Sequence, residues 1–168
     1  MKILLRSLKE REDKDVYDMF QEIPASENGL ENPAYGLSFE EFQRFCEVRM
    51  ARSKGLDLPD GYVPDTYYLL YVDEVPVGVA KLRHFLNDFL LKRGGHIGYG
   101  IRPSCRKRGY GKILLTEVLK KAREKGIDKA LITIEENNLP SRKVCEGNGG
   151  KLEKIIANEC HYWIDLRR

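Results

Sequence analysis

Apolar positions in the first part of the chain recur at spacings that predict one strand and two helices. Residues 2–6 form an apolar run typical of a strand, and residues 15–22 place apolar side chains at helical spacing. Residues 23–37 are rich in Pro, Gly, Asn and Ser, which predicts a loop. Ser38 and Glu41 form a capping box, so a second helix is expected to begin there.

Strand and helix patterns then alternate. Two β-rich runs within residues 66–84 predict a hairpin that turns around Asp73 and Glu74. Residues 96–102 predict the next strand. Residues 109–125 carry apolar positions at helical spacing and predict a long helix.

The last part of the chain repeats this alternation. Residues 129–136, KALITIEE, form a near-continuous apolar run, which predicts a strand buried on both faces in the middle of a sheet. A short helix over residues 140–145 and strands over residues 151–156 and 161–166 follow. A crossover helix between parallel strands, with antiparallel hairpins around it, predicts an α/β fold with a mixed sheet.

Length and composition suggest one domain over residues 1–168. A chain of 168 residues is about the size of one typical domain. It lacks an apolar run of the roughly 20 residues that a membrane helix needs, so no membrane partner is expected. The charged run KEREDKD follows the short apolar start too closely for a secretion signal, which predicts a cytoplasmic protein. A homodimer is left open.

Cysteine spacing and net charge argue against further classes of protein. Cys46, Cys105, Cys145 and Cys160 lie far apart without a CxxC pair, which argues against a zinc site or a disulfide framework and predicts free thiols, mostly buried. A net charge of +3 is too small to imply a nucleic-acid partner by itself.

Residues 97–119, IGYGIRPSCRKRGYGKILLTEVL, place basic side chains and two glycines between a strand pattern and a helix pattern. The first N–H groups of a helix have no acceptor inside it, and the aligned peptide dipoles put partial positive charge there. Glycine also lets the backbone approach a ligand closely. The sequence therefore predicts an anion-binding turn.

Three phosphate-binding motifs compete for this turn. A P-loop is excluded because Lys112 is not followed by Ser or Thr, and no glycine stands five residues before Gly111. A GxGxxG dinucleotide motif is weakened because Leu114 stands where the third small residue belongs. The remaining pattern is RxxGxG, carried by Arg106, Gly109 and Gly111.

The RxxGxG turn within YGIRPSCRKRGYGKILL resembles the pyrophosphate-binding turn of the GNAT superfamily of N-acetyltransferases. The superfamily has, about 30 residues later, a strand ending in Asn, a helix and a glycine; ITIEENNLPSRKVCEGNGGKLEK is similar, with Asn138, Ser141 and Gly149. RHFLNDFLLKRGGHIGYGIRPS also resembles a branch of bacterial predicted acetyltransferases. The resemblance covers about residues 67–166.

The resemblance implies an α/β fold with a mixed, mostly antiparallel central sheet flanked by helices, and a parallel strand pair that splays at the cofactor site. It implies acetyl-CoA (coenzyme A) as co-substrate, without a metal. Asn138 has a second expected role as a helix N-cap. The implied cofactor-binding residues are Tyr99, Gly100, Ile101, Arg106, Lys107, Arg108, Gly109, Tyr110, Gly111, Lys112, Asn138 and Ser141.

Acetyl transfer to an amine needs a neutral amine, stabilisation of the oxyanion and a proton for the leaving thiolate. His96 and Glu135 are the candidate bases, although His96 is as well explained by a structural role and Glu135 by a solvated carboxylate. The N–H of Ile101 is the candidate oxyanion donor. Many GNAT enzymes have a proton-donating tyrosine seven residues after the asparagine; here Cys145 stands there, and Tyr162 or Tyr99 is the candidate substitute.

The implied reaction moves an acetyl group to a primary amine of a small molecule or peptide by direct attack in a ternary complex. Arg83, His84 and Asn87 are the candidate substrate-binding residues, and they hint at a polar acceptor that bears a carboxylate. Two other functions stay open. One is a coenzyme A-binding module without turnover, and the other is a nucleic-acid-binding protein that uses the basic turn.

Overall fold

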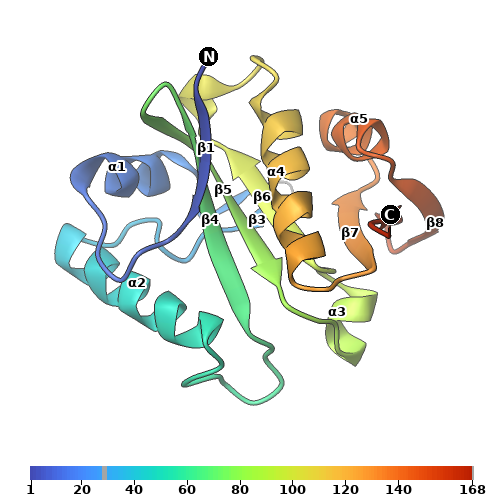
Figure 1. The fold of residues 1–168 in the computed structure, drawn as a ribbon, viewed down its shortest axis with the longest axis horizontal. Helices are drawn as coiled ribbons and strands as arrows, with labels where there is room; N and C mark the ends of the chain where they lie inside the picture. Colours follow the sequence, from blue (N-terminus) through green and yellow to red (C-terminus); the bar gives the residue numbers. More distant parts are fainter. Residues whose placement is uncertain (28–29, 168) are drawn as a thin grey trace.

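Seven of the strands in the computed structural model, which describes residues 1–27 and 30–167, form two antiparallel sheets (Figure 1). The larger sheet has the order β1-β4-β5-β6 and the smaller one the order β7-β9-β8. The strands are β1 (Ile3–Ser7), β4 (Asp65–Val72), β5 (Val75–Arg83), β6 (Ile97–Ile101), β7 (Lys129–Glu135), β8 (Lys151–Ile156) and β9 (Glu159–Asp165).

The two sheets meet where β6 and β7 begin. The crossover through the helix that follows β6 makes these strands run in the same direction (Figure 1). The N–H of His96 donates to the carbonyl of Leu131 at 2.7 Å, but among the described residues no strand ladder continues from this contact. The strands therefore part beyond His96, so the parallel pair is splayed as predicted, and the ladders on either side of it are antiparallel.

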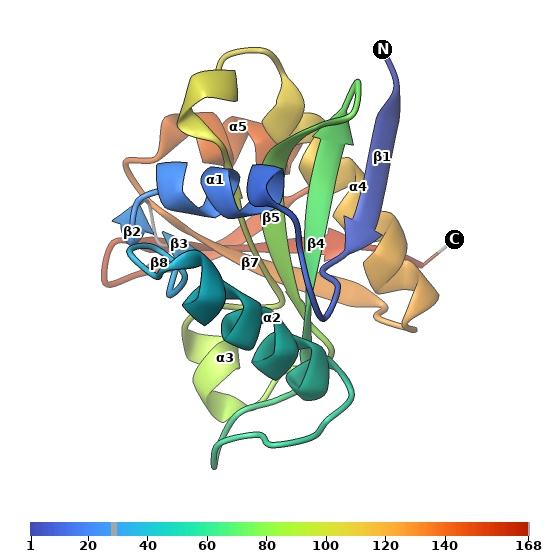
Figure 2. The same ribbon diagram turned by 90° about the vertical axis from the view of Figure 1, so that its left-hand side faces the viewer.

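Helices cover both faces of the larger sheet. Figure 2 shows α1 (Lys14–Glu22) and α2 (Phe39–Ser53) on one side of it and α4 (Tyr110–Glu124) on the other. Alternate residues of β4 enter two apolar cores: Leu69 packs with α1 and α2, and Leu70 packs with α4. The helices in the described part of the chain are too short or too polar to cross a membrane.

Local sequence features position these elements as predicted. Ser38 and Glu41 form the expected capping box at the start of α2, with N–H to side-chain oxygen distances of 3.1 and 2.9 Å. Asp73 and Glu74 turn the hairpin with positive φ angles. β7 is buried over most of its length, as its apolar run predicts, but it is an outer strand of the smaller sheet and not a central one.

Three short elements differ from the predictions. The expected loop over residues 23–37 contains a small hairpin of β2 (Ser26–Glu27) and β3 (Leu30–Glu31); Asn28 and Gly29 of that loop lie outside the described residues, as does Arg168 of the expected domain. A further helix, α3, follows β5, and a turn of 3-10 helix, η1, follows β6. Their bounds and those of the last helix are α3 (Asp88–Lys92), η1 (Pro103–Cys105) and α5 (Leu139–Gly147).

Candidate active site

The basic turn between β6 and α4 has the backbone of an anion-binding site. Gly109 precedes α4 with a φ of 80°, a left-handed conformation that glycine adopts without strain. The N–H groups of Tyr110, Gly111 and Lys112 lie in the first turn of α4, where a helix offers them no acceptor. No side chain of the described residues accepts a hydrogen bond from them, so they are free to bind an anion.

A groove of about 260 Å³ runs beside this turn, and we call it the α4 groove. A Cβ on Gly111 would lie 3.9 Å from both Ile101 and Val144, so the missing side chain leaves the groove open. The groove is lined by Tyr99, Ile101, Cys105, Arg106, Lys107, Gly109, Tyr110, Gly111, Lys112, Pro140, Ser141 and Val144.

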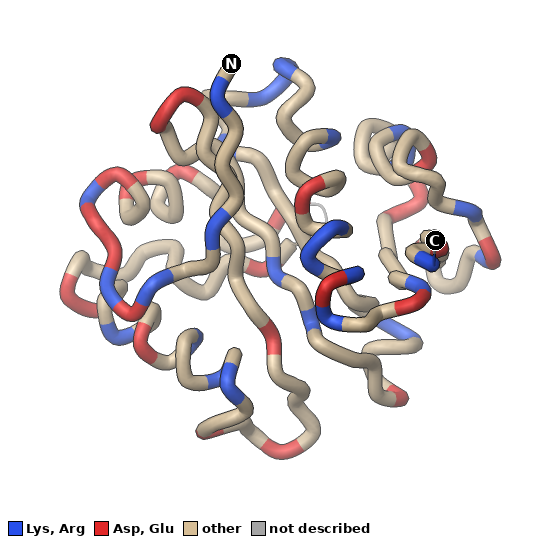
Figure 3. Tube along the Cα trace, viewed as in Figure 1, with Lys and Arg blue, Asp and Glu red and all other residues tan. Residues whose placement is uncertain are grey.

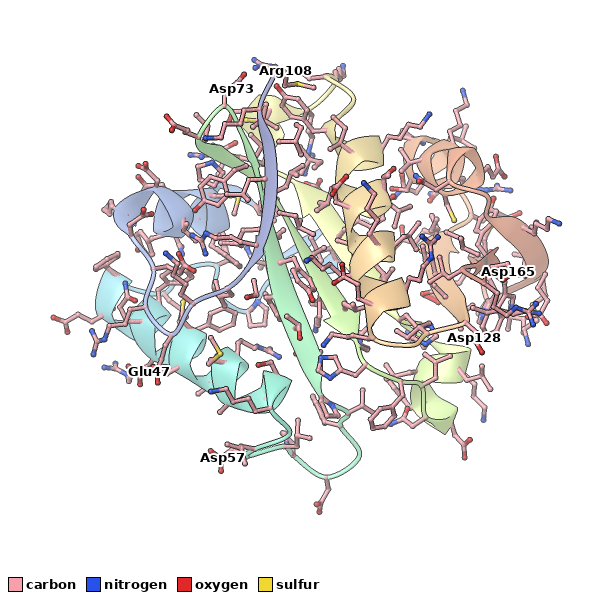
Figure 4. All side chains as sticks on the ribbon, in the orientation of Figure 1. Glu47, Asp57, Asp73, Arg108, Asp128 and Asp165 are labelled. Atoms are coloured by element: carbon pink, nitrogen blue, oxygen red, sulfur yellow. The ribbon has the colours of Figure 1, made fainter. Side chains whose placement is uncertain are left out.

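The basic side chains of the turn have different surroundings. Arg106 forms an ion pair with Glu27 and donates from Nε to the carbonyl of Ile101 at 3.0 Å, so it ties the turn to β2. Lys107 and Lys112 are exposed and line the groove. Arg108 does not line it, and Figure 4 shows this residue at the outer edge of the molecule.

The backbone of β6 offers further hydrogen-bonding groups to the groove. Arg102 donates to the carbonyl of Val77, and His96 accepts from the N–H of Arg83. Because hydrogen-bonded positions alternate along an antiparallel pair, Gly100 also faces β5, whereas Tyr99 and Ile101 direct their N–H groups toward the opening beside β7. Of the residues expected from this strand, Tyr99 and Ile101 therefore have a free N–H, and Gly100 does not.

A second groove of about 120 Å³ lies where β6 and β7 part, and we call it the β6–β7 groove. It shares Tyr99 and Ser141 with the α4 groove, so the two grooves adjoin at these residues. Its lining residues are Leu30, Glu31, Lys81, Arg83, Gly94, Ile97, Gly98, Tyr99, Ile132, Thr133, Ile134, Asn138 and Ser141.

Tyr99 lies at the junction of the two grooves. Its hydroxyl is buried and has no hydrogen-bond partner among the described residues. Burial raises the pKa of Tyr99 to about 12, with a smaller opposing effect of the nearby Ser141 hydroxyl and a smaller raising effect of Cys145. The phenol is therefore protonated at neutral pH and can donate a hydrogen bond to a bound molecule.

Asn138 and Ser141 join the end of β7 to the start of α5. The Asn138 side chain accepts from the N–H of Ser141 at 3.3 Å, so Asn138 is the N-cap of α5. Asn138 also lines the β6–β7 groove, and Ser141 lines both grooves. The capping role and a position beside a ligand are therefore compatible.

His96 has the geometry of a structural histidine rather than a base. Its Nδ1 accepts from the N–H of Leu131 at 2.9 Å, and its side chain lines neither groove. Burial, with a smaller effect of the Arg83 guanidinium, lowers the pKa of His96 to about 4. Gly95 permits the close approach of the strands, since a Cβ there would lie only 2.4 Å from the carbonyl oxygen of Leu131. The geometry thus favours the structural alternative for His96.

Two other catalytic candidates also lie away from both grooves. Glu135 borders a separate hollow near the turn between β8 and β9. Tyr162 is fully buried, and its hydroxyl donates to Glu146 at 2.7 Å and accepts from Arg142 Nε at 3.0 Å. Burial raises the pKa of Tyr162. This geometry argues against Tyr162 as the proton donor, and against Glu135 as a base in either groove.

Only one of the three substrate-binding candidates lines the β6–β7 groove. Arg83 does so, and its Nη1 donates to the carbonyls of Gly94 and Gly95, both at 3.1 Å. His84 instead lies 2.8 Å from the Thr66 hydroxyl through Nε2. Asn87 caps α3 by accepting from the N–H of Leu90, so its role is structural.

Lys81 is a basic groove residue that the sequence predictions missed. It lies two residues before Arg83 on β5, and both side chains line the β6–β7 groove. The signal was present, because Ala80 and Leu82 alternate with these two cations and are buried. A strand with two cations on one face indicates that this face is not purely core.

The cysteines fit the prediction of free thiols. All four are unpaired, and Cys46, Cys145 and Cys160 are buried. Burial raises the pKa of Cys145 to about 12, so this thiol is a packing residue and not an acid. Within residues 1–27 and 30–167 no cluster of His, Cys, Asp or Glu has the arrangement of a metal site.

Two antiparallel sheets that part between the parallel strands β6 and β7, beside a free helix start, define the architecture of an acyltransferase of the GNAT type. The sequence pattern of the acetyltransferase (GNAT) family matches residues 30–149, which is more than half of the chain. The chain therefore belongs to the GNAT acetyltransferase family. No curated protein sequence matches it.

Solved structures share this fold over almost the full chain. RimL, a ribosomal L7/L12 alpha-N-protein acetyltransferase in complex with coenzyme A, is 18% identical with a TM-score of 0.70 and coverage of 99% of this chain and 97% of that one. The Campylobacter jejuni N-acetyltransferase PseH with acetyl coenzyme A is 16% identical (TM-score 0.64; 98% and 99% covered). The PaiA N-acetyltransferase from Thermoplasma acidophilum with coenzyme A is 18% identical (TM-score 0.63; 98% and 99% covered).

Proposed function

We propose that this protein is an acetyl-CoA-dependent N-acetyltransferase that moves an acetyl group to a primary amine of a small molecule or peptide, by direct attack in a ternary complex. The observation that carries the proposal is that two grooves adjoin at Tyr99 and Ser141, which line both of them. One groove opens at the anion-binding start of α4, and the other opens between the parting strands. Two substrates can therefore meet at their junction.

Coenzyme A fits the α4 groove by its chemistry. Its pyrophosphate would accept hydrogen bonds from the free N–H groups at the start of α4, as anions do at helix starts. Its extended arm would bond to the free backbone groups of Tyr99 and Ile101, which places the thioester at the junction. RimL and PaiA are solved with coenzyme A and PseH with acetyl coenzyme A, which supports this assignment.

The reaction is a direct transfer. The lone pair of the neutral amine attacks the thioester carbonyl carbon, a C–N bond forms, the C–S bond breaks, and the proton lost by the amine ends on the thiol. The free N–H of Ile101, which lines the α4 groove, is the proposed fixed donor for the developing oxyanion. Lys81 and Arg83 in the acceptor groove disfavour a charged ammonium beside them, so the amine reacts as the free base.

In this proposal Tyr99 stabilises the leaving thiolate. Cys145 stands where many family members have the acid, but its thiol is buried and held protonated. The Tyr99 phenol comes from β6 on the other side of the junction, and it is protonated, buried and unpartnered. A hydrogen bond from this hydroxyl to the sulfur would stabilise the charge that develops as the C–S bond breaks.

The test is thiol release from acetyl-CoA across an amine library, with Tyr99→Phe as the decisive variant. Tyr99→Phe should lower kcat by roughly 10²- to 10³-fold, as loss of one donor to a developing anion does, while coenzyme A affinity stays near normal. Tyr35→Phe is the matched control, because Tyr35 is half-exposed and lines neither groove.

Two outcomes would count against this account. An unchanged kcat in Tyr99→Phe would remove Tyr99 from the reaction. Coenzyme A binding without thiol release for any amine would instead favour a binding module. No observation favours nucleic acid, since Figure 3 shows Lys and Arg interspersed with Asp and Glu over most elements.

A further inference from the structure

Lys81 and Arg83 present two cations to the β6–β7 groove without a carboxylate partner. In the described part of the chain neither side chain forms an ion pair. Among the described residues, Arg83 donates hydrogen bonds only from Nη1, to the carbonyls of Gly94 and Gly95. The Lys81 ammonium has no hydrogen-bond acceptor among the described residues, and its Nζ lies 5.7 Å from the centre of the Tyr67 ring.

More positive charge lies behind this pair. Arg49 and Arg52 of α2 lie close enough to Lys81 to lower its pKa, and the carboxylate among these neighbours is Asp65. Arg49 is 3.9 Å from an Asp65 oxygen, so that carboxylate is already shared. Burial and these cations lower the pKa of Lys81 to about 8. Four cationic side chains against the buried Asp65 and the exposed Glu31 leave an excess of positive charge at the groove.

The same cluster contains polar atoms that lack a partner. Asp65 and Tyr67 are each 6% exposed, and one Asp65 carboxylate oxygen and the Tyr67 hydroxyl have no hydrogen bond among the described residues. The Nε of Arg52 is also buried and has no hydrogen-bond partner among the described residues. Buried polar atoms without partners are costly, so they mark a place where folding stability has not been optimised.

The groove gives a ligand access to the two cations. Gly98 lies opposite Lys81 in the β5–β6 register and contributes no side chain to fill the space. Among the described residues Glu31 is the carboxylate that lines the groove; it is exposed on β3 and accepts from the Ser26 hydroxyl at 3.2 Å. A bound anion would therefore meet Lys81 and Arg83 without being forced against a buried acid.

We propose that the acetyl acceptor carries an anionic group, a carboxylate or a phosphate, that binds between Lys81 and Arg83 while its amine points toward Tyr99. This proposal rests on the N-acetyltransferase function proposed above. It follows from the unpaired cations, the excess of positive charge and the single groove that contains both Lys81 and Tyr99. The acceptor class is then amino acids and related amines with a nearby anion.

The test compares anionic acceptors with neutral counterparts that carry the same amine chain. The probes are glycine against glycinamide, β-alanine against β-alaninamide, and 2-aminoethylphosphonate against ethanolamine, each with acetyl-CoA. The anionic member of a pair should have the higher kcat/KM by about tenfold or more, the scale of one charged hydrogen-bonded contact. The amide has the less basic amine and hence more free base, so this bias works against the expected preference.

Variants at Lys81 assign the preference to the groove. Lys81→Gln should lower the preference for the anionic member by about tenfold, and Lys81→Arg should restore most of it. Lys92→Gln is the matched control, since Lys92 is exposed on α3 and lies outside the groove. Equal use of the amides, or an anionic preference that survives Lys81→Gln, would overturn the proposal.

A binding measurement separates this proposal from the proposed function. Melting curves are recorded with coenzyme A, and then with coenzyme A plus β-alanine, 2-aminoethylphosphonate or their neutral partners. If the anionic probe raises the melting temperature and Lys81→Gln removes that shift, the anion site stands even without turnover. If coenzyme A stabilises the protein but the anionic probes add nothing beyond their neutral partners, the anion site fails while the cofactor assignment survives.

Discussion

His96 holds the two sheets together through both its backbone and its ring. The His96 N–H donates to the carbonyl of Leu131, and the ring Nδ1 accepts from the N–H of the same residue. The neutral ring must carry its proton on Nε2 to accept at Nδ1. Protonating the ring would turn an acceptor into a donor opposite a donor, and would put a charge in a buried place.

Acid should therefore weaken the fold through His96. Above pH 6.5 the ring is neutral in the folded and the unfolded chain, and its contribution is fully present. As the pH falls from 6.5 toward the folded pKa of about 4, the unfolded chain binds the proton first, so the free energy of unfolding falls by up to about 3 kcal/mol. Urea unfolding at several pH values in this range measures the loss.

His96→Asn is the matched variant, because a carboxamide oxygen can accept at the position of Nδ1 and does not titrate. Carboxylates titrate equally in both proteins, so the difference between them isolates the histidine. The variant should lose less stability on acidification, and its rate per folded molecule should stay near normal. A large loss of rate at normal stability would return His96 to the role of base.

The roles of single residues were only partly predictable. The free N–H groups of the turn and the N-cap of Asn138 follow from local chemistry, so the sequence could predict them. Tyr162 and the His96 ring are buried by elements that pack over them. A single sequence does not reveal which elements these are. Lys81 was predictable from alternation along β5, but not the fact that its face opens into a groove.

At the scale of elements, the start of α4 should bind coenzyme A only while Gly111 lacks a side chain. A Cβ there would meet Ile101 and Val144 at ordinary contact distance, so Gly111→Val should fold. Its methyl groups would occupy the groove where a pyrophosphate approaches the backbone. The stabilisation by coenzyme A, measured as a shift in melting temperature, should fall by more than half.

Gly147→Val is the control for this variant. A Cβ at Gly147 would meet only the flexible end of Lys112 at about van der Waals distance, and Gly147 does not line the groove. This control should keep the full shift. Normal coenzyme A binding in a folded Gly111→Val protein would move the cofactor away from α4.

Long elements were predictable and short ones were not, for a physical reason. α2 and α4 carry their own signals, namely a capping box, a glycine start and apolar spacing. The strands β2 and β3 have two residues each, which is too short to show an alternation of apolar and polar positions. They are held by packing against β6: a Cβ on Gly100 would lie 2.4 Å from a Leu30 methyl group. α3 is likewise a single turn capped by Asn87.

For the whole molecule, coenzyme A should raise thermal stability, because it would contact elements of both sheets. A ligand that binds only the folded chain adds RT ln(1 + [L]/Kd), which is about 2.7 kcal/mol at a hundredfold excess over Kd. For a domain of this size that corresponds to roughly 5 to 10 °C in melting temperature. Differential scanning fluorimetry with acetyl-CoA measures it, with adenosine as the control that lacks the pyrophosphate and the arm. An unchanged melting curve at millimolar acetyl-CoA would contradict the proposed function.

The parting of β6 and β7 also leaves β6 with an unpaired strand edge. A strand edge exposed on the surface recruits strands of other chains, and this is how sheet proteins aggregate. Here the free N–H groups of Tyr99 and Ile101 face an internal opening beside β7, with α4 and α5 alongside. The chain thus keeps, within a groove, a strand edge that can pair with an extended ligand.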